Sequence, residues 1–271
     1  APITNEVNVP SAEHEAFLRR YGVRQDTTNE FPIAEHPQSP AADVLLALSK
    51  YDSAIEELRQ ASRLPHARFP LEYTAKSPGE MVFPHYESLK STASVLRLRA
   101  IAELGDERSE RALADIRLIL HLADSIRREP LRWSLRTRME IVNYAIQPIW
   151  EGLARRQWSA DQLVAMEREL ERFDLMRDYS LVLRSDLAWQ LKIIDYLRVE
   201  RMANSFDCMC GKPMFWPTLA YRLSPSGWFF MNQVAMARCY QAAFPTSAEL
   251  SQRILSPDIP RRFEETAGQV R

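Results

Sequence analysis

The sequence predicts an all-α protein, built as an irregular array of helical hairpins, either a tetratricopeptide- or HEAT-like α-solenoid or a bundle. Only 7 of its 271 residues are glycine, against a usual share of about 7%, and tight β-hairpins and phosphate-binding loops need glycine. Apolar residues make up 46% of the chain, and in the longest segments they recur at about 3.6-residue spacing. Long helices begin near residues 85, 130 and 175, and a period of about 45 residues is typical of helical repeats.

Residues 1–40 are predicted to form an extended N-terminal arm or linker. They contain five prolines and little apolar periodicity, apart from a short helix expected over 11–20. A single helical domain follows over 41–262, and a polar tail over 263–271 ends the chain. Within the domain, residues 64–85 contain four prolines, so this segment cannot be one continuous helix.

Apolar stripes and terminal signals define the expected helices. Gly105 and Asp106 form a turn in which Gly105 caps the preceding helix. Pro130 suits the first turn of a helix, and Ser159 with Gln162 forms a capping box. The expected helices are 41–48, 52–63, 85–104, 107–127, 130–157, 159–172, 174–202 and 226–243, with a turn-rich segment over 204–225 and a short helix after Pro245.

The stretch QPIWEGLARRQWSADQL, residues 147–163, combines two tryptophans with a pair of arginines. An apolar stripe that begins with Met139, Val142 and Ile146 continues through Ile149, Trp150 and Leu153. Trp158 directly precedes the next helix cap, where a hydrophobic residue packs onto the new helix. We therefore interpret the stretch as a hairpin corner whose tryptophans are packing residues and not ligand-binding residues.

Several motifs in order resemble a known group of sequences. They are LPHARFPLEY, PHYESLKSTASVLRLRAIAEL, ALADIRLILHLADSIRREP, IQPIWEGLARRQWSADQL and SGWFFMNQVAMARCYQ. Together they are similar to an uncharacterised family of bacterial proteins from verrucomicrobial and planctomycete-type genomes, over most of residues 55–262. The resemblance implies a helical body that follows an N-terminal membrane helix and a polar linker. It therefore implies an extracytoplasmic location in the periplasm or cell envelope, with a cytoplasmic location as the alternative. It implies no activity.

Charge gives no support for a nucleic-acid partner. The chain has 35 basic and 36 acidic residues and a net charge of −1, so no global field attracts polyanions. Thirty of the basic residues are arginines, which indicates either phosphate recognition or genomic base composition. Their scatter among acids along helices favours composition, and Asp124 with Arg128 is expected to form one such i,i+4 pair. No run of about 18 apolar residues is present, so we expect membrane contact only through a segment absent from this sequence.

Three cysteines, Cys208, Cys210 and Cys239, allow three interpretations. A zinc site needs four ligands, and no histidine lies near these cysteines in sequence. A disulfide from Cys208 or Cys210 to Cys239 would close a loop of about 30 residues and stabilise the fold by roughly 3–4 kcal/mol. Free or buried thiols are the third interpretation and the default one. We expect no metal and no cofactor.

Two groups of residues are candidate binding residues. Trp228 and Phe230 lie beside Asn232 at a helix start. They form either an aromatic platform for a sugar or peptide, or the packed end of the array.

The second group lies at the proline-rich segment and consists of His66, Arg68 and His85. If the segment crosses the helices, the two histidines converge with the carboxylates of Glu103 and Glu129.

We expect a non-catalytic interaction scaffold of the cell envelope that binds a protein or peptide. The sequence contains no H-E-x-x-H, no G-x-S-x-G and no closely paired acids. The alternative is an enzyme or small-ligand-binding protein with a pocket between loops 64–84 and 204–230. A chain-binding protein predicts a long open groove with exposed aromatics or arginines. An enzyme predicts one deep pocket with titratable groups of perturbed pKa.

Overall fold

The structure is a computed structural model that describes residues 31–64, 66–71, 73, 81–200, 223–246, 249, 252 and 256–269. Its helices are α2 (Pro40–Leu48), α3 (Asp52–Ala61), α4 (Pro84–Gly105), α5 (Ser109–Ser125), α6 (Arg132–Ala154), α7 (Ala160–Glu171), α8 (Leu175–Glu200), α11 (Ser226–Ala243) and α13 (Ile259–Gln269), with a 3₁₀ turn at Ser49–Tyr51. These residues contain no strand, which confirms the prediction of an all-α protein.

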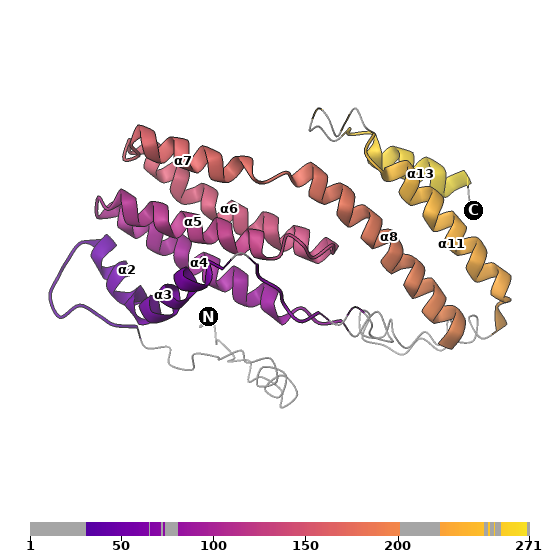
Figure 1. Cartoon of the computed structure of the whole chain (residues 1–271), viewed down its shortest axis with the longest axis horizontal. Helices are drawn as coiled ribbons and strands as arrows, with labels where there is room; N and C mark the ends of the chain where they lie inside the picture. Colours follow the sequence, from indigo (N-terminus) through magenta and orange to yellow (C-terminus); the bar gives the residue numbers. More distant parts are fainter. Residues whose placement is uncertain are drawn as a thin grey trace, which may run out of the picture.

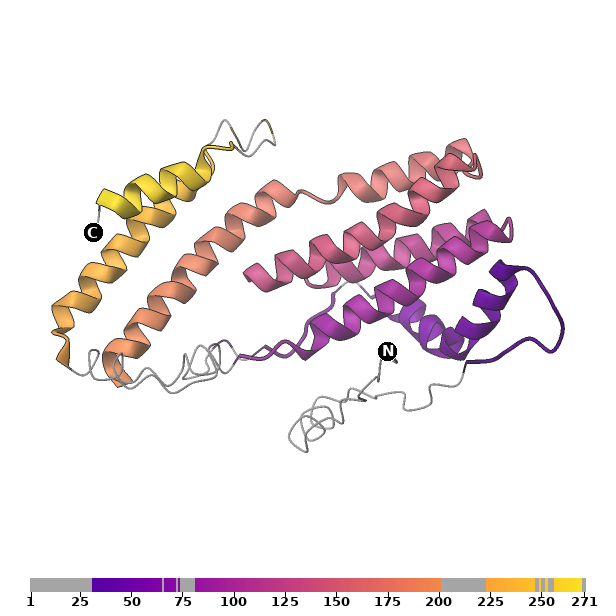
Figure 2. The same ribbon diagram turned by 180° about the vertical axis from the view of Figure 1, so that it is seen from behind.

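The helices form two neighbouring groups (Figures 1 and 2). Helices α4, α5, α6 and α7 follow one another up and down as a bundle, and the short α2 and α3 lie beside α4. Helix α8 continues away from the bundle. Helix α11 returns along α8, and α13 packs on α11. The start of α8 therefore lies at the junction of the two groups.

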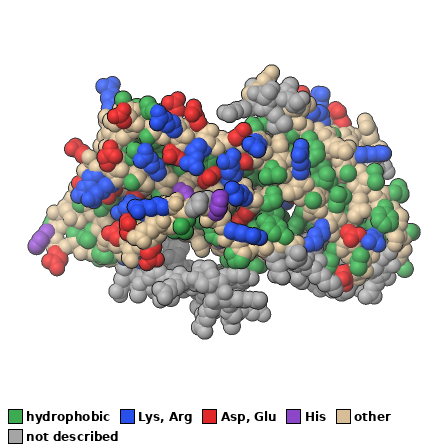
Figure 3. Space-filling view, viewed as in Figure 1, with side chains coloured by type: hydrophobic (Ala, Val, Ile, Leu, Met, Phe, Trp, Pro, Cys, Tyr) green, Lys and Arg blue, Asp and Glu red, His purple; other side chains and the backbone are tan. Residues whose placement is uncertain are grey.

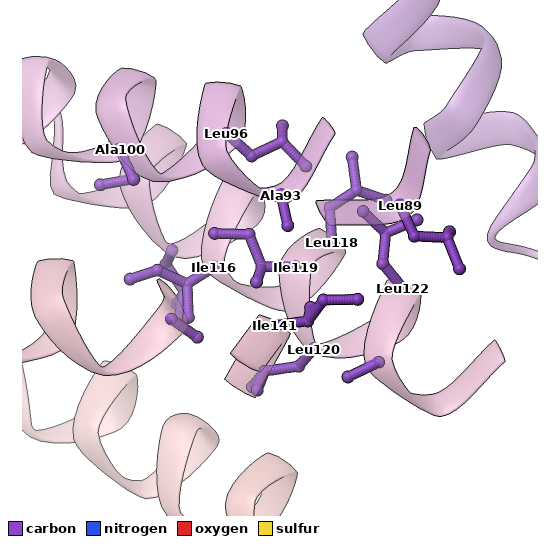
Figure 4. Packing of buried hydrophobic residues seen from close by; sticks show 14 of the residues in the cluster. Leu89, Ala93, Leu96, Ala100, Ile116, Leu118, Ile119, Leu120, Leu122 and Ile141 are labelled. Atoms are coloured by element: carbon purple, nitrogen blue, oxygen red, sulfur yellow. The ribbon is translucent and has the colours of Figure 1, made fainter. Parts of the chain in front are cut away.

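The core lies where α4, α5 and α6 meet, and it combines large and small apolar residues. Leu96 of α4, Ile116 and Ile119 of α5 and Ile141 of α6 are completely buried, and Figure 4 shows these side chains converging. Fully burying one such side chain contributes about 1.5–3 kcal/mol. The same region contains fully buried alanines on all three helices, which let the helix backbones approach closely.

Most predicted boundaries agree with the structure to within about two residues. The capping box at the start of α7 is confirmed. The Gln162 amide nitrogen of the backbone donates to the Ser159 hydroxyl at 3.2 Å, and the Ser159 amide donates to the Gln162 side chain at 2.9 Å. Residues 1–30, including the predicted helix 11–20, lie outside the described residues, as do 204–222 and most of the segment after Pro245.

The C-terminal boundary is corrected. Residues 263–269 were assigned to a polar tail by their composition, but they continue α13. The ring of Phe263 packs edge-on against the ring of Tyr240 in α11, with centroids 6.3 Å apart. Phe263 and the buried Ile259 give this helix an apolar face to bury.

The turn between α4 and α5 also differs from the prediction. Gly105 is the last helical residue, and the left-handed backbone, with a φ of 60°, occurs at Glu107. Glycine at 105 eases packing, because an added Cβ would lie 3.0 Å from the Cβ of Ala41 and α2 would have to shift by a few tenths of an ångström. The helix end is closed by the Arg108 amide, which donates to the Glu103 carbonyl at 2.8 Å.

The predicted packing role of Trp150 is wrong, whereas that of Trp158 is confirmed. Trp150 is 69% exposed and Trp158 is 9% exposed. Met139 and Ile146, on the same predicted stripe, are about half exposed. The buried line of α6 runs one position away, and its members are mostly small or charged. It consists of Arg138, Ile141, Ala145, Pro148 and Gly152.

Trp158 lies directly on Gly152, so this glycine is sterically required. An added Cβ at Gly152 would lie 2.3 Å from the indole, whose nitrogen donates to the Ile149 carbonyl at 2.9 Å. We expect Gly152→Ala to lower the free energy of unfolding by about 1–3 kcal/mol through overpacking, measured by urea denaturation.

The matched control is Gly268→Ala in α13, where an added Cβ has no neighbour within 4 Å. This change should be neutral or stabilise by up to about 1 kcal/mol, because alanine favours helix more than glycine does. Equal effects of the two substitutions would contradict the packing of Trp158 on Gly152.

Candidate binding groove

Three open clefts on one face of the bundle join into a continuous groove. The first, of about 740 Å³, shares His121 and Asp124 with a second of about 580 Å³. It shares four residues, Ser125 and Arg128 among them, with a third of about 1020 Å³. The groove therefore runs from the end of α3, past the C-terminal half of α5 and the start of α8, to the segment 66–73.

Arginine dominates the lining, and we call this surface the arginine groove. Its arginines are Arg59, Arg63, Arg68, Arg117, Arg127, Arg128, Arg172, Arg177 and Arg184. Its carboxylates are Asp124, Glu129, Glu169 and Asp178. No lysine is among the residues that line the three clefts. Basic side chains with histidines among them extend across the middle of this face in Figure 3.

Six of these nine arginines have no ion pair within the described part of the chain, and all six are exposed. They are Arg63, Arg68, Arg117, Arg128, Arg177 and Arg184. By contrast, Arg59 pairs with the buried Asp115 at 2.5 Å, and Arg172 pairs with Glu169 at 2.9 Å. Because a guanidinium stays protonated in proteins, the arginine groove has an excess of positive charge.

The predicted pair between Asp124 and Arg128 is not formed. Helix α5 ends at Ser125, so Arg128 lies beyond the helix and the i,i+4 geometry is lost. Asp124 instead lies 3.8 Å from Arg127 and 3.8 Å from Arg172. Arg128 is thereby left without a carboxylate partner among the described residues.

A buried ion pair positions the wall of the groove that α8 provides. Arg138 of α6 is 2% exposed. Its Nη1 donates to Oδ2 of Asp178 in α8 at 2.6 Å, and its Nε donates to the Ala123 carbonyl of α5 at 3.1 Å. Arg127 lies 3.7 Å from the other Asp178 oxygen. One carboxylate therefore joins α8 to both α5 and α6, next to Arg177.

The predicted convergence of His85 with Glu129 is present in the structure. The His85 Nε2 lies 3.1 Å from a Glu129 oxygen, and the Tyr86 hydroxyl donates to the other oxygen at 2.8 Å. Phe69 stacks on the His85 imidazole with centroids 4.4 Å apart. Burial, together with the hydrogen bond to Glu129, raises the pKa of Tyr86 far above its ordinary value, so this phenol is protonated.

The other predicted residues of this group separate into two places. His66 and Arg68 are exposed and line the third cleft together with Glu129. Glu103 does not join them. It is buried at the end of α4, 3.8 Å from Arg108, and burial raises the pKa of its carboxyl.

The aromatic candidates line a separate cleft of about 930 Å³ between α11 and α13. Trp228 and Phe230 are about half exposed there, and Arg198 of α8 lies over the Phe230 ring at 5.2 Å. The Asn232 amide donates to the Trp228 carbonyl at 2.8 Å, so the helix backbone satisfies this side chain. These residues do not take part in the arginine groove.

The Cys239 side chain is buried at the same cleft. Cys208 and Cys210 lie outside the described residues, so the disulfide stays a prediction. The loop 204–222 also lies outside the described residues. The pocket between this loop and the proline-rich segment therefore stays a prediction. Among the described residues, no three or more His, Cys, Asp or Glu side chains are grouped to hold a metal ion.

Comparison with known protein families, curated proteins and solved structures finds no match to this chain. In the described part of the chain, no helix has the length and apolar character to cross a membrane.

The Arg138–Asp178 pair is expected to be coupled in stability. Asp178→Ala leaves the buried guanidinium without its anion, so we expect the free energy of unfolding to fall by about 3–5 kcal/mol. The double variant Arg138→Met/Asp178→Leu removes both charges and should recover much of that loss. Urea denaturation of both variants measures the coupling, which is refuted if the double variant is the less stable of the two.

His121, at the junction of the first two clefts, is expected to titrate below its ordinary pKa of 6.5. Burial lowers the pKa, the Asp124 carboxylate opposes this, and the Arg172 guanidinium lowers the pKa further. NMR titration of the imidazole should give a midpoint below 6.5.

The unfolded chain then takes up this proton first as the pH falls. The stabilising effect of His121 is therefore present above about pH 6.5 and is lost on acidification. His121→Gln should make the stability less dependent on pH in this range.

Proposed function

We propose that the protein is a non-catalytic interaction scaffold that holds an extended segment of a protein or peptide in the arginine groove. The continuity of the three clefts supports this proposal, since a chain ligand needs an open path and not one deep pocket. Much of the path is lined by residues of α5 and α8, and the loops after α3 and after α5, together with the segment 66–73, complete its walls. Segments of this kind typically bind with micromolar affinity through several weak contacts.

The arrangement of the helices as repeats is part of the same proposal. The hairpin α4–α5 begins at residue 84 and the hairpin α6–α7 at residue 132. The pair formed by α8 and α11 begins at residue 175. We propose that they are irregular repeats of one hairpin unit, because such arrays present extended surfaces for binding chains. We also propose a location in the cell envelope, and this proposal rests on the family resemblance.

One observation favours the alternative, a pocket for a small ligand. Glu129 lines the third cleft and is held by two hydrogen bonds from His85 and Tyr86, an arrangement that fixes a carboxylate for binding a cation or a donor group. Phe69 covers the imidazole, and the Ser134 hydroxyl beside the cluster donates to the backbone carbonyl of Glu129. The cluster therefore favours binding over catalysis.

The proposal is tested by selecting short random peptides against the protein by phage display. A photoreactive p-benzoylphenylalanine placed at Ser125, which lines two of the clefts, should crosslink to the selected peptides. The matched control carries the same group at Ser91, an exposed position on α4.

Crosslinking at Ser125 and not at Ser91 is the expected result, with micromolar affinity by fluorescence anisotropy. The proposal fails if no peptide is selected, or if the selected peptides crosslink equally at both positions.

A further inference from the structure

We infer that the occupant of the arginine groove is an acidic peptide segment whose carboxylates pair with Arg128, Arg177 and Arg184. This inference rests on the proposed function and specifies the chemistry of the partner. The three arginines line the first cleft, are exposed, and have no ion pair within the described residues. Arg177 and Arg184 lie on α8, whose position the buried Asp178 fixes, and Arg128 lies in the loop after α5.

The side-chain chemistry of the groove favours carboxylates. A guanidinium presents planar pairs of N–H donors that match a carboxylate with two parallel hydrogen bonds, whereas an ammonium acts as a point charge. The groove uses arginine and no lysine. Its cations therefore fit an oxyanion that accepts two parallel hydrogen bonds, as a carboxylate does.

The distance between the two arginines of α8 predicts the distance between acidic residues in the bound peptide. Arg177 and Arg184 are seven residues apart on one helix, which places their Cα atoms on the same side at a separation of about 10 Å. In an extended polyproline II chain, side chains at i and i+3 share a face and are about 9 Å apart. We therefore expect acidic residues three positions apart in the bound segment.

Two partly exposed carboxylates of the groove disfavour a nucleic acid. Asp124 is shared by two clefts and is 32% exposed, and Glu169 is 31% exposed in the second cleft. A nucleic-acid backbone has a charge at every phosphate, so it would bring some of them against these carboxylates. A peptide can place an uncharged residue or a backbone N–H at Asp124 instead.

The test compares four fluorescein-labelled probes by anisotropy with the full chain. The first is an Ala/Pro peptide with glutamate at every third position. The second and third carry glutamine or lysine at those positions, and the fourth is a single-stranded oligonucleotide of equal charge. We expect the glutamate peptide to bind most tightly. Its binding should weaken steeply with added salt, because exposed ion pairs are screened.

The variant Arg128→Gln/Arg177→Gln/Arg184→Gln should weaken binding of the glutamate peptide by about tenfold or more, since each exposed ion pair contributes a few-fold. The matched control removes three exposed arginines elsewhere, Arg136→Gln/Arg155→Gln/Arg261→Gln, and should change the affinity less than about threefold. Circular dichroism checks that both variants are folded. A second readout is the His121 imidazole, whose pKa should rise when the glutamate peptide binds, because a nearby anion favours the imidazolium.

Each outcome separates the inference from the proposed function. If the glutamine peptide binds as tightly as the glutamate peptide and crosslinks at Ser125, the groove binds chains but not acidic ones. The inference then fails and the proposed function stands. If the oligonucleotide binds most tightly and the triple variant abolishes this, both fail. If the triple variant and its control weaken the glutamate peptide equally, general charge and not the groove is responsible, and the inference fails.

Discussion

The buried ion pair between Arg138 and Asp178 is the contact on which the arrangement of the binding face depends. A guanidinium inside a helical core is strongly unfavourable without an anion, and the only carboxylate within hydrogen-bonding distance among the described residues comes from the first turn of α8. The packing of α6 in the core and the placement of α8 therefore depend on the same ion pair. Arg177, the residue before Asp178, is positioned at the groove by the same contact.

The helical architecture was accessible from the sequence because its signals are local. Scarcity of glycine, the 3.6-residue stripes and the Ser159 capping box each act within a few residues, and the structure bears them out. The contact face of α6 was not accessible in this way. Its buried line contains alanine, proline, glycine and arginine, whereas the stripe of large apolar residues is only partly buried. Val142 and Ile149 pack against the core, but Trp150, which was assigned to it, is exposed. Which face is buried depends on where α5 and α8 pack, and this is a tertiary property.

The binding face was predictable only in part, for a related reason. His66, Arg68 and His85 were singled out because a proline-rich segment next to histidines signals a loop over helices, and they lie at or directly beneath the third cleft. The arginines of α5 and α8 gave no such signal, since each has acids nearby in sequence. The one available clue was the doubled Arg127 and Arg128 at a helix end. Helix α5 stops before Arg128, and this boundary separates it from the Asp124 that would otherwise neutralise it.

A balanced total charge is compatible with a strongly basic groove because electrostatic interactions in salt solution are local. The chain as a whole has a net charge of −1, yet a ligand in the groove senses charges within about 10 Å at 0.1 M salt. Arg138, which is buried in the bundle, is matched by the carboxylate of Asp178. Six of the nine arginines that line the groove have no carboxylate partner among the described residues. What marks this surface as a candidate for binding is the gathering of these six arginines along one connected set of clefts. It appears only when the helices are assembled, since the pairing partners of Asp124 and Asp178 come from different helices.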